Sequence, residues 1–253
     1  KRTTMGKIFS TLIDMSYPLK PKCLFCGSQE NINYFGLCKY CVSLLPYISK
    51  PVCRRCGKPY SHGVSHDACS LCLNTEMYFE KGYTVFEFSG IVQNTLYRLK
   101  YGGETELADV FGKLMADYAA ELKEHINLII PVPLHIEKLK KRGFTQSWLI
   151  CKALGREWGI DSSDKALVRS RYTESQINLS KKQRLANVRG AFALNSRFKI
   201  QGKSVLIVDD IMTTGSTLNE CSRMLKSGGA SHVYALTAAC PVHMDEPMAD
   251  TEP

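Results

Sequence analysis

The most constraining feature of the chain is the string VLIVDDIMTTGSTL, which spans Val205 to Leu218. Its first four residues are apolar without a break, and such a run predicts a strand of a parallel sheet that is buried on both faces. Asp209 and Asp210 follow where that strand is expected to end, and a loop of small hydroxyl residues comes next. The segment from Leu218 to Leu225 then has helical spacing. The string therefore predicts a strand, a loop and a helix in the order typical of an α/β fold.

The end of this strand is also a predicted ligand site. In open α/β sheets, ligands bind beyond the carboxyl ends of the strands, and a helix N-terminus offers N–H groups to anions. A capped turn accounts for one acid and one hydroxyl, but it leaves the second acid and the other hydroxyls without a role. The loop consists of Thr213, Thr214, Gly215, Ser216 and Thr217.

Known phosphate-binding motifs narrow this interpretation. No Lys follows Gly215, which excludes a Walker A loop, and the chain has no G-x-G-x-x-G fingerprint of a dinucleotide site. The order of strand, paired acids, hydroxyl-rich loop and helix resembles the phosphoribosyl diphosphate (PRPP) motif of type I phosphoribosyltransferases. We therefore expect a type I phosphoribosyltransferase-like domain of the α/β class, with a mostly parallel, doubly wound sheet.

Eight of the eleven cysteines occur before residue 73, in four C-x-x-C pairs separated by eleven, eleven and twelve residues. A C-x-x-C turn directs two thiolates toward one point, and two such turns complete the tetrahedral shell of a zinc ion. We predict two four-cysteine zinc ribbons, with the first two pairs on one ion and the last two pairs on the other. The spacing also allows an interleaved pairing. The pairs are Cys23/Cys26, Cys38/Cys41, Cys53/Cys56 and Cys69/Cys72.

Other roles for the cysteines are less consistent with the sequence. A disulfide framework requires an oxidising compartment, and no targeting signal is evident. A redox-active C-x-x-C motif usually occurs once, beside a βαβ pattern. His62 and His66 are possible substitute ligands, but eight thiolates already fill two sites. We expect the three isolated thiols to be small buried hydrophobes; they are Cys151, Cys221 and Cys240.

Strand and helix patterns alternate from Gly82 onward, which favours a mostly parallel sheet covered by helices. Strands are expected at 83–88, 128–130, 205–208 and 232–238, and helices at 90–99, 107–122, 147–158 and 218–225. We divide the chain into an N-terminal helix, or in part an extension ahead of Met5, at 1–19, a double zinc ribbon at 20–76, a phosphoribosyltransferase-like domain at 77–242 and a disordered acidic tail at 243–253.

The positive charge of the chain is concentrated in one stretch. The formal net charge is +9, and between Lys138 and Lys203 there are sixteen Lys and Arg but four Asp and Glu. Such a stretch suits a polyanionic ligand, either a diphosphate or a nucleic-acid backbone, although solvated helix faces produce similar counts. No apolar run approaches the ~20 residues of a membrane span, so we expect no transmembrane segment.

Three further strings extend the resemblance beyond the PRPP-type loop. They are PVPLH at 131–135 followed by RGFTQ at 142–146, RSRYTESQ at 169–176, and RLANVRGAF at 184–192. Together with the double zinc ribbon, they resemble the ComF family of competence proteins, from about Tyr17 to Pro241. The family usually has Asn where this chain has Thr145.

The resemblance implies a role for each part of the site. Asp209 and Asp210 would accept hydrogen bonds from the ribose hydroxyls of PRPP and help to hold Mg²⁺. The loop Thr213–Thr217 would bind the 5′-phosphate, while Lys100 and Arg142 would face the diphosphate. Candidates for a mobile basic flap are Arg169, Arg184 and Arg189, for which surface salt bridges are the alternative. For Gln146 and Gln176 the sequence does not decide between a role in the site, a helix cap and a surface position.

The resemblance also implies a role with DNA. It favours a competence protein that binds PRPP-like ligands and single-stranded DNA, and that handles DNA taken up during natural transformation. Such a protein would act in the cytoplasm or at the inner face of the membrane, with other DNA-uptake proteins as partners. Nucleic-acid contacts are expected from Arg54, Arg55 and Lys58. Tyr34, Phe35, Tyr40, Tyr47 and Tyr60 can stack bases or, more commonly, pack the ribbon core.

The alternative is a Mg²⁺-dependent phosphoribosyltransferase that transfers ribose 5-phosphate to a base, nucleotide or amine. Its catalysis would consist of positioning and electrostatic stabilisation of the departing diphosphate. A regulator that senses PRPP without turnover is a third class. The sequence identifies neither a base-recognition region nor a general base for an acceptor, so it leaves binding and transfer open.

Overall fold

The computed structural model describes residues 21–49, 51–59, 68–171 and 188–242. The chain divides into two compact units, of which the first ends at Leu44 and the second begins at Leu45. Several sequence predictions lie outside the described residues. These concern the segments 1–19 and 243–253, and the residues Tyr60, His62, His66, Gln176 and Arg184.

The first unit contains one of the two ribbons. The turn after Cys23 is closed by a hydrogen bond from the Gly27 N–H to the Cys23 carbonyl at 2.7 Å. Helix α2 (Lys39–Ser43) begins after Cys38, whose side chain accepts from the backbone N–H of Cys41 and caps the helix. Two cysteine-bearing turns are thereby brought together in a segment that has little apolar core of its own.

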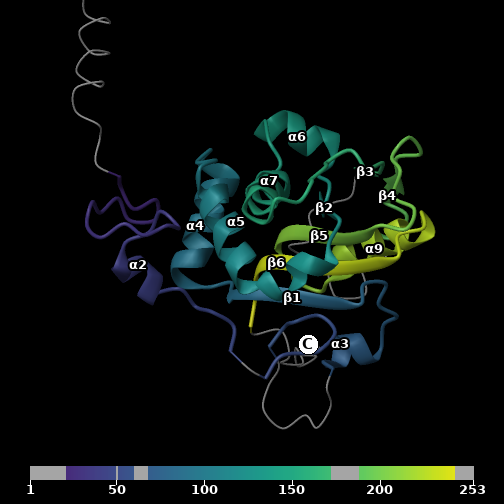
Figure 1. The fold of residues 1–253 in the computed structure, drawn as a ribbon, viewed down its shortest axis with the longest axis horizontal. Helices are drawn as coiled ribbons and strands as arrows, with labels where there is room; N and C mark the ends of the chain where they lie inside the picture. Colours follow the sequence, from purple (N-terminus) through teal and green to yellow (C-terminus); the bar gives the residue numbers. More distant parts are fainter. Residues whose placement is uncertain (1–20, 50, 60–67, 172–187, 243–253) are drawn as a thin grey trace, which may run out of the picture. The chain divides into compact units, whose positions relative to one another are not determined.

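The second unit is built on a four-stranded parallel sheet with the order β1-β6-β5-β2. Its strands are β1 (Lys81–Glu87), β2 (Leu128–Pro131), β5 (Ser204–Ile211) and β6 (His232–Cys240) (Figure 1). Strand β5 lies between β6 and β2, and Val205 to Val208 are fully buried. The expected parallel α/β architecture is confirmed.

Helices cover both faces of this sheet. Helix α7 (Gln146–Trp158) packs on β5 and β2 and against α5 (Leu107–Tyr118), which in turn contacts α4 (Gly90–Tyr101). Helix α9 (Ser216–Ser227) shares a core with the alternate β5 residues Val205 and Ile207. Because successive strand residues point to opposite faces, α9 and α7 lie on different sides of β5.

Shorter elements complete the second unit. The hairpin strands β3 (Leu167–Arg169) and β4 (Phe192–Leu194) pair antiparallel beside α9. The remaining helices are α3 (Ser70–Leu73), the 3₁₀ helix η1 (Ala120–His125) and α6 (Ile136–Arg142). Among the described residues, none of the helices combines the length and the apolar character needed to cross a bilayer.

Several boundaries differ by a few residues from those expected, and three of these differences bear on the site. Strand β5 continues through both aspartates, because Asp209 and Ile211 remain in register with β6. Helix α4 extends to Tyr101, since the Gly102 N–H still reaches the Arg98 carbonyl at 2.8 Å. The helix predicted over 107–122 is instead α5 followed by η1, with a break at Ala119. The three isolated cysteines are buried as expected.

The second ribbon is part of the same core as α9. Its four cysteines cluster with residues of α9, β5 and β6. The Gly82 N–H of β1 donates to the Arg55 carbonyl at 2.6 Å. Gly57 has a φ of +73°, and a Cβ at that position would lie 2.6 Å from the Gly82 carbonyl oxygen. Only glycine therefore allows the ribbon turn to approach β1 this closely.

Candidate functional site

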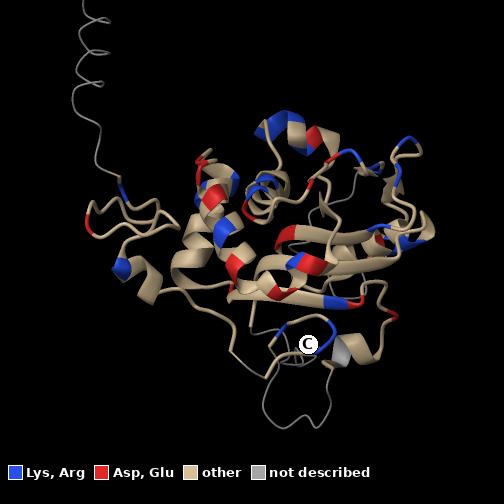
Figure 2. Cartoon of the chain, in the orientation of Figure 1, with Lys and Arg blue, Asp and Glu red and all other residues tan. Residues whose placement is uncertain are grey.

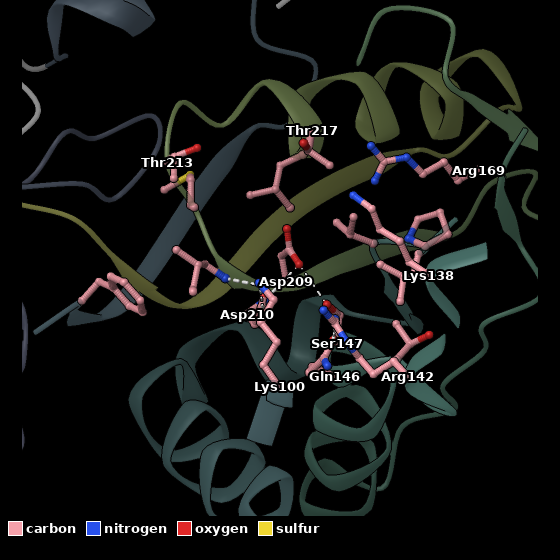
Figure 3. A pocket seen from close by; sticks show the side chains of 18 of the residues that line it. Lys100, Lys138, Arg142, Gln146, Ser147, Arg169, Asp209, Asp210, Thr213 and Thr217 are labelled. Atoms are coloured by element: carbon pink, nitrogen blue, oxygen red, sulfur yellow. Dashed lines mark hydrogen bonds and ion pairs between the residues drawn. The ribbon is translucent and has the colours of Figure 1, made fainter. Parts of the chain in front are cut away.

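A pocket of about 830 Å³ opens at the carboxyl ends of β2 and β5. The hydroxyl-rich loop Thr213–Thr217 forms one wall, and the segment after β2 together with α6 forms another. Figure 3 shows Asp209 and Asp210 among these lining side chains, with Lys138, Arg142 and Arg169 to one side. The pocket therefore lies where an open α/β sheet is expected to bind its ligand.

The two aspartates have different environments. Asp209 accepts a hydrogen bond from Ser147 Oγ at 2.8 Å and another from the Asp210 backbone N–H at 3.0 Å. Asp210 lies 3.7 Å from Lys100 Nζ, measured to its Oδ2. Burial, followed by the charge of Asp210, raises the pKa of Asp209 to about 8. A ligand that brings donors or positive charge to this carboxyl favours its ionised form.

The loop ends at the N-terminus of α9, whose groups suit an anion. Gly215 adopts φ +71° at the N-cap of α9, a left-handed conformation that suits glycine, and it provides no side-chain cap. The hydroxyls of Thr214 and Ser216 are 2.7 Å apart and half enclose the start of the helix. Backbone N–H groups, hydroxyls and the positive end of a twelve-residue helix together suit a phosphate.

Five cations line the same pocket. They are Lys100, Lys138, Lys141, Arg142 and Arg169. Burial, and then the charges of Arg169, Arg142 and Lys100, lower the pKa of Lys138. Figure 2 shows the concentration of basic residues along α6, which carries three of the five. Because these like charges repel one another, a polyanionic ligand would relieve the repulsion.

Gln146, whose role the sequence leaves open, is a lining residue with an unsatisfied donor. Its side chain is 4% exposed, and its Oε1 accepts from Arg142 Nη1 at 2.7 Å. Among the described residues, its Nε2 has no hydrogen-bond partner. A buried donor without a partner costs about 1–3 kcal/mol, so an acceptor atom of a ligand is the natural complement.

The cysteines form the two groups expected from consecutive pairs, rather than interleaved ones. Within each group the Sγ atoms lie within 4.8 Å of one another. Cys26 and Cys38 are separated by 3.6 Å between sulfurs, and Cys56 and Cys69 by 3.8 Å. Thiolates about 2.3 Å from a tetrahedral zinc ion are roughly 3.8 Å apart, so both groups fit zinc. All eleven cysteines are described, and none forms a disulfide.

The three basic residues of the second ribbon differ in their contacts. Arg54 and Arg55 are exposed, although Arg55 Nη1 also donates to the Cys72 carbonyl at 3.0 Å. Lys58 donates through Nζ to the carbonyl of Thr213 in the hydroxyl-rich loop. Sequence reasoning missed this contact, because the two residues are 155 positions apart. Their roles in nucleic-acid binding stay predictions.

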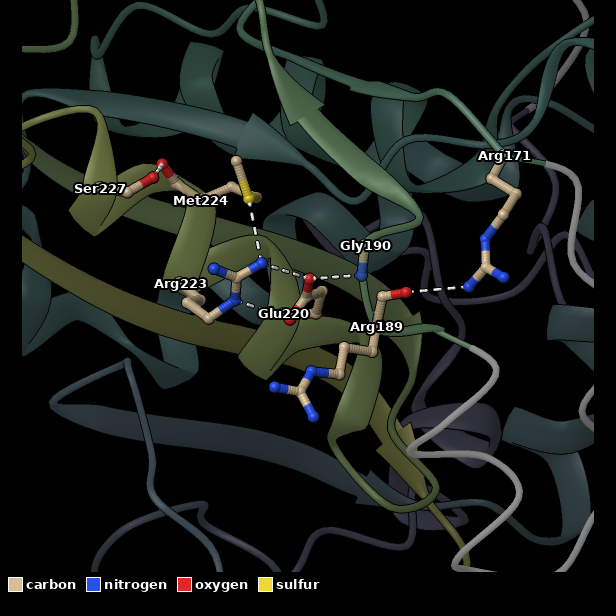
Figure 4. Close-up of polar contacts among 7 residues, drawn as sticks. All are labelled: Arg171, Arg189, Gly190, Glu220, Arg223, Met224 and Ser227. Atoms are coloured by element: carbon tan, nitrogen blue, oxygen red, sulfur yellow. Dashed lines mark hydrogen bonds and ion pairs between the residues drawn. The ribbon is translucent and has the colours of Figure 1, made fainter.

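The candidate flap residues that are described lie at the ends of the segment 172–187. Arg169 lines the pocket, while Arg189 is exposed and its carbonyl accepts from Arg171 Nη2 at 2.8 Å. Glu220 of α9 binds both the Gly190 N–H and the Arg223 guanidinium (Figure 4). These contacts hold the hairpin ends on α9, and they place Arg169, rather than Arg189, at the site.

Comparisons with known proteins agree with this architecture. A double zinc ribbon domain matches residues 12–73, and a phosphoribosyl transferase domain matches residues 161–250. The fold and site thus define a double zinc ribbon joined to a phosphoribosyltransferase-like domain. A solved structure of a glutamine PRPP amidotransferase from B. subtilis matches 53% of this chain and 26% of the amidotransferase chain, with 21% sequence identity. The TM-score of this match is 0.38, which is too low to support an argument.

Relatives that match most of the length of the chain identify its family. "DNA utilization protein YhgH" of Escherichia coli (strain K12) is 31% identical over 83% of this chain and 93% of its own length. "Competence protein F" of Haemophilus influenzae is 30% identical over 84% and 93%, and "Competence protein ComFC" of Bacillus subtilis is 27% identical over 85% and 93%. The chain belongs to the ComF family.

The two zinc sites are predicted to differ in their importance for the second unit. Cys56→Ser should lower the melting temperature of that unit, because Cys56 is buried in the core shared with α9. Cys26→Ser, in the first unit, should leave that transition within about 2 °C of the wild type while reducing bound zinc by one ion per chain. Calorimetric unfolding with metal analysis measures both, and equal destabilisation by the two variants would contradict the difference.

Asp209→Asn is predicted to stabilise the protein at high pH. The folded-state pKa of Asp209 is raised above the unfolded value. The contribution of this carboxyl to the free energy of unfolding is therefore fully present below pH ~4 and is lost as the pH rises toward about 8. Asn cannot ionise, and the gain in melting temperature should therefore be smallest near pH 4 and largest above pH 8. Asp109→Asn, at an exposed ion pair with Arg156, is the matched control. A pH-independent difference would refute the assigned pKa.

Proposed function

We propose that this ComF-family protein binds PRPP, or a related phosphoribosyl ligand, together with Mg²⁺, and that it also binds single-stranded DNA. Its role is in the cytoplasmic handling of DNA taken up during natural transformation. The names of its relatives, a DNA utilization protein and competence proteins, support the DNA part of the proposal. The chemistry of the pocket supports the phosphoribosyl part.

The observation that carries the proposal is the placement of three kinds of group around one pocket. The carboxylates of Asp209 and Asp210 suit the two ribose hydroxyls. The N-terminus of α9 and its hydroxyls suit a 5′-phosphate. Lys100 and Arg142 suit a diphosphate, and the Nε2 of Gln146 suits one of its oxygens. No neutral ligand would satisfy the clustered cations and the phosphate-binding helix terminus together.

Magnesium fits the same residues. The two adjacent carboxylates offer the oxygen ligands that this hard cation takes, alongside diphosphate oxygens and water. Bound there, Mg²⁺ would neutralise part of the charge on the diphosphate. Asp209 would then act as a carboxylate oriented by Ser147, and Asp210 would share its charge between the cation and Lys100.

Binding is favoured over transfer by what lines the pocket. Its described lining contains no His, no Cys and no carboxylate besides Asp209 and Asp210. Apart from the lysines and tyrosines of the lining, a general base for an acceptor would therefore have to come from the groups assigned to the ribose. Phosphoribosyl transfer stays the alternative, and acceleration of diphosphate release by any base, nucleotide or amine would establish it.

The first ribbon supports the DNA part. Tyr34 and Tyr40, for which the sequence left base stacking and core packing open, are 64% and 68% exposed. The cysteine cluster leaves these two rings little apolar core to join. Tyr47 of the second unit does pack, with its ring centroid 4.7 Å from that of Phe86. Exposed rings beside a metal knuckle are suitable for stacking bases.

The double variant Asp209→Asn/Asp210→Asn is predicted to lose PRPP binding. Each lost charge-assisted hydrogen bond contributes roughly 1.5–3 kcal/mol, so we expect affinity to fall about 100-fold or more. Titration calorimetry with PRPP and Mg²⁺ measures the affinity, and Asp109→Asn/Asp117→Asn, which removes two exposed carboxylates of α5, controls for the change in charge. Gln146→Met should weaken binding about 10-fold without lowering the melting temperature. Unchanged affinity in the double variant would refute the site.

Single-stranded DNA binding is predicted to depend on Arg54 and Arg55. Replacing both by Gln should reduce the slope of log affinity against log salt by about 1.4, because each phosphate contact on a single strand contributes about 0.7. The control, Arg197→Gln/Lys199→Gln, removes the same charge from two exposed residues between β4 and β5. An equal effect of the two double substitutions, or the absence of measurable DNA affinity at low salt, would refute the role of Arg54 and Arg55 in DNA binding.

A further inference from the structure

We propose that single-stranded DNA stacks its bases on an aromatic ladder at the pocket, formed by the rings of Phe88, Tyr97 and Tyr101. The inference rests on the proposed function, because it states where the DNA meets the phosphoribosyl site. The ladder belongs to the second unit and lies on a part of the chain different from the ribbon arginines considered above.

The three rings form a continuous row of contacts, in which one pair is stacked and the other is edge-on. Tyr97 and Tyr101 are four residues apart on α4 and so share one face of the helix. Their ring centroids are 6.1 Å apart, and their planes are inclined by 28°. Phe88, just after β1, lies edge-on to Tyr97 with a centroid distance of 5.8 Å. All three residues line the pocket that holds the two aspartates.

The ladder is not needed for packing of the core. The buried face of α4 carries Val92, Leu96 and Leu99, which point into the protein. Tyr97 and Tyr101 remain 45% and 67% exposed. Large rings that stay accessible at the mouth of a polar pocket are available to a planar ligand, and aromatic side chains gain most from an offset or stacked partner.

Cations flank the exposed end of the ladder. The Arg142 guanidinium lies 5.4 Å from the Tyr101 ring centroid, and Lys100 Nζ lies 5.9 Å from it. Lys138 and Lys141 line the same pocket. Stacking rings for bases, with cations for the backbone, are the combination by which proteins hold single strands.

This combination selects one class of ligand. A DNA duplex hides the faces of its bases, so it cannot use the rings. An acidic peptide can use the cations, but it brings no planar groups to stack on Tyr97 and Tyr101. A single strand uses both features. Its path also reaches the phosphoribosyl pocket, because Lys100 precedes Tyr101 directly and pairs with Asp210 at 3.7 Å.

Fluorescence anisotropy with a labelled oligo-dT of fifteen nucleotides tests the ladder. Tyr101→Ala should weaken binding about 5- to 150-fold, the range for loss of one stacked base. Tyr101→Phe keeps the ring and should stay within about twofold of the wild type. Tyr118→Ala removes an exposed ring of α5 that does not line the pocket, and it shows whether any exposed tyrosine has the same effect.

A second probe separates stacking from charge. An abasic oligonucleotide of equal length keeps the phosphates, so its affinity should not change in Tyr101→Ala. Equal losses in Tyr101→Ala and Tyr101→Phe, or equal losses for the abasic and base-bearing strands, would overturn the proposal. If Tyr101→Ala does not fold, Tyr101→Leu retains the bulk without the ring and gives the same test.

Failure of the ladder is distinguishable from failure of the proposed function. If the wild type binds PRPP and oligo-dT but the Tyr101 variants bind DNA normally, the ladder proposal fails and the proposed function stands. If the wild type binds PRPP but no oligo-dT at low salt, the ladder fails together with the DNA half of the function. If it binds oligo-dT through Tyr101 but no PRPP, the ladder stands and the phosphoribosyl assignment fails.

Discussion

The central strand β5 is the element on which the rest of the structure depends. It is hydrogen-bonded to β6 on one side and β2 on the other, and its apolar residues are buried on both faces. Such a strand has no exposed side along its length, and apart from Ser204 at its start its polar residues lie at its carboxyl end. That constraint places two carboxylates side by side at the mouth of the pocket. Burial and the neighbouring charge of Asp210 raise the pKa of Asp209 to about 8, so this carboxyl is largely protonated near neutral pH until a ligand or cation favours its ionised form.

The second ribbon contributes to this site through packing. Its cysteines share a core with α9, the helix whose N-terminus completes the hydroxyl-rich loop. Lys58 binds the Thr213 carbonyl, and Asn219 of α9 binds the backbone of Glu76 and Tyr78 at 2.8 and 2.7 Å. Metal binding by this ribbon and the shape of the loop are therefore coupled by direct contacts. The first ribbon forms a compact unit of its own, and two of its tyrosines are exposed to solvent.

Much of this arrangement could be predicted from local sequence. The apolar run of β5, the loop after it and the four C-x-x-C pairs are each complete within a few residues, so their patterns are readable without a fold. Contacts between distant segments left no such pattern. Ser147 reaches Asp209 across 62 positions, and nothing near Ser147 marks it as a partner. The helix predicted at 90–99 ends two residues before Tyr101, whereas α4 continues through Tyr101 and stacks its ring on that of Tyr97.

The position of bound PRPP tests the account most directly. A crystal structure of the protein with PRPP and Mg²⁺ should place the ribose hydroxyls on Asp209 and Asp210, the 5′-phosphate at the N-terminus of α9, and the diphosphate toward Lys100 and Arg142. Arg142 and Gln146 should both contact the ligand in that complex. A ligand held elsewhere on the chain, or a pocket that contains no PRPP in crystals grown at saturating concentration, would contradict it.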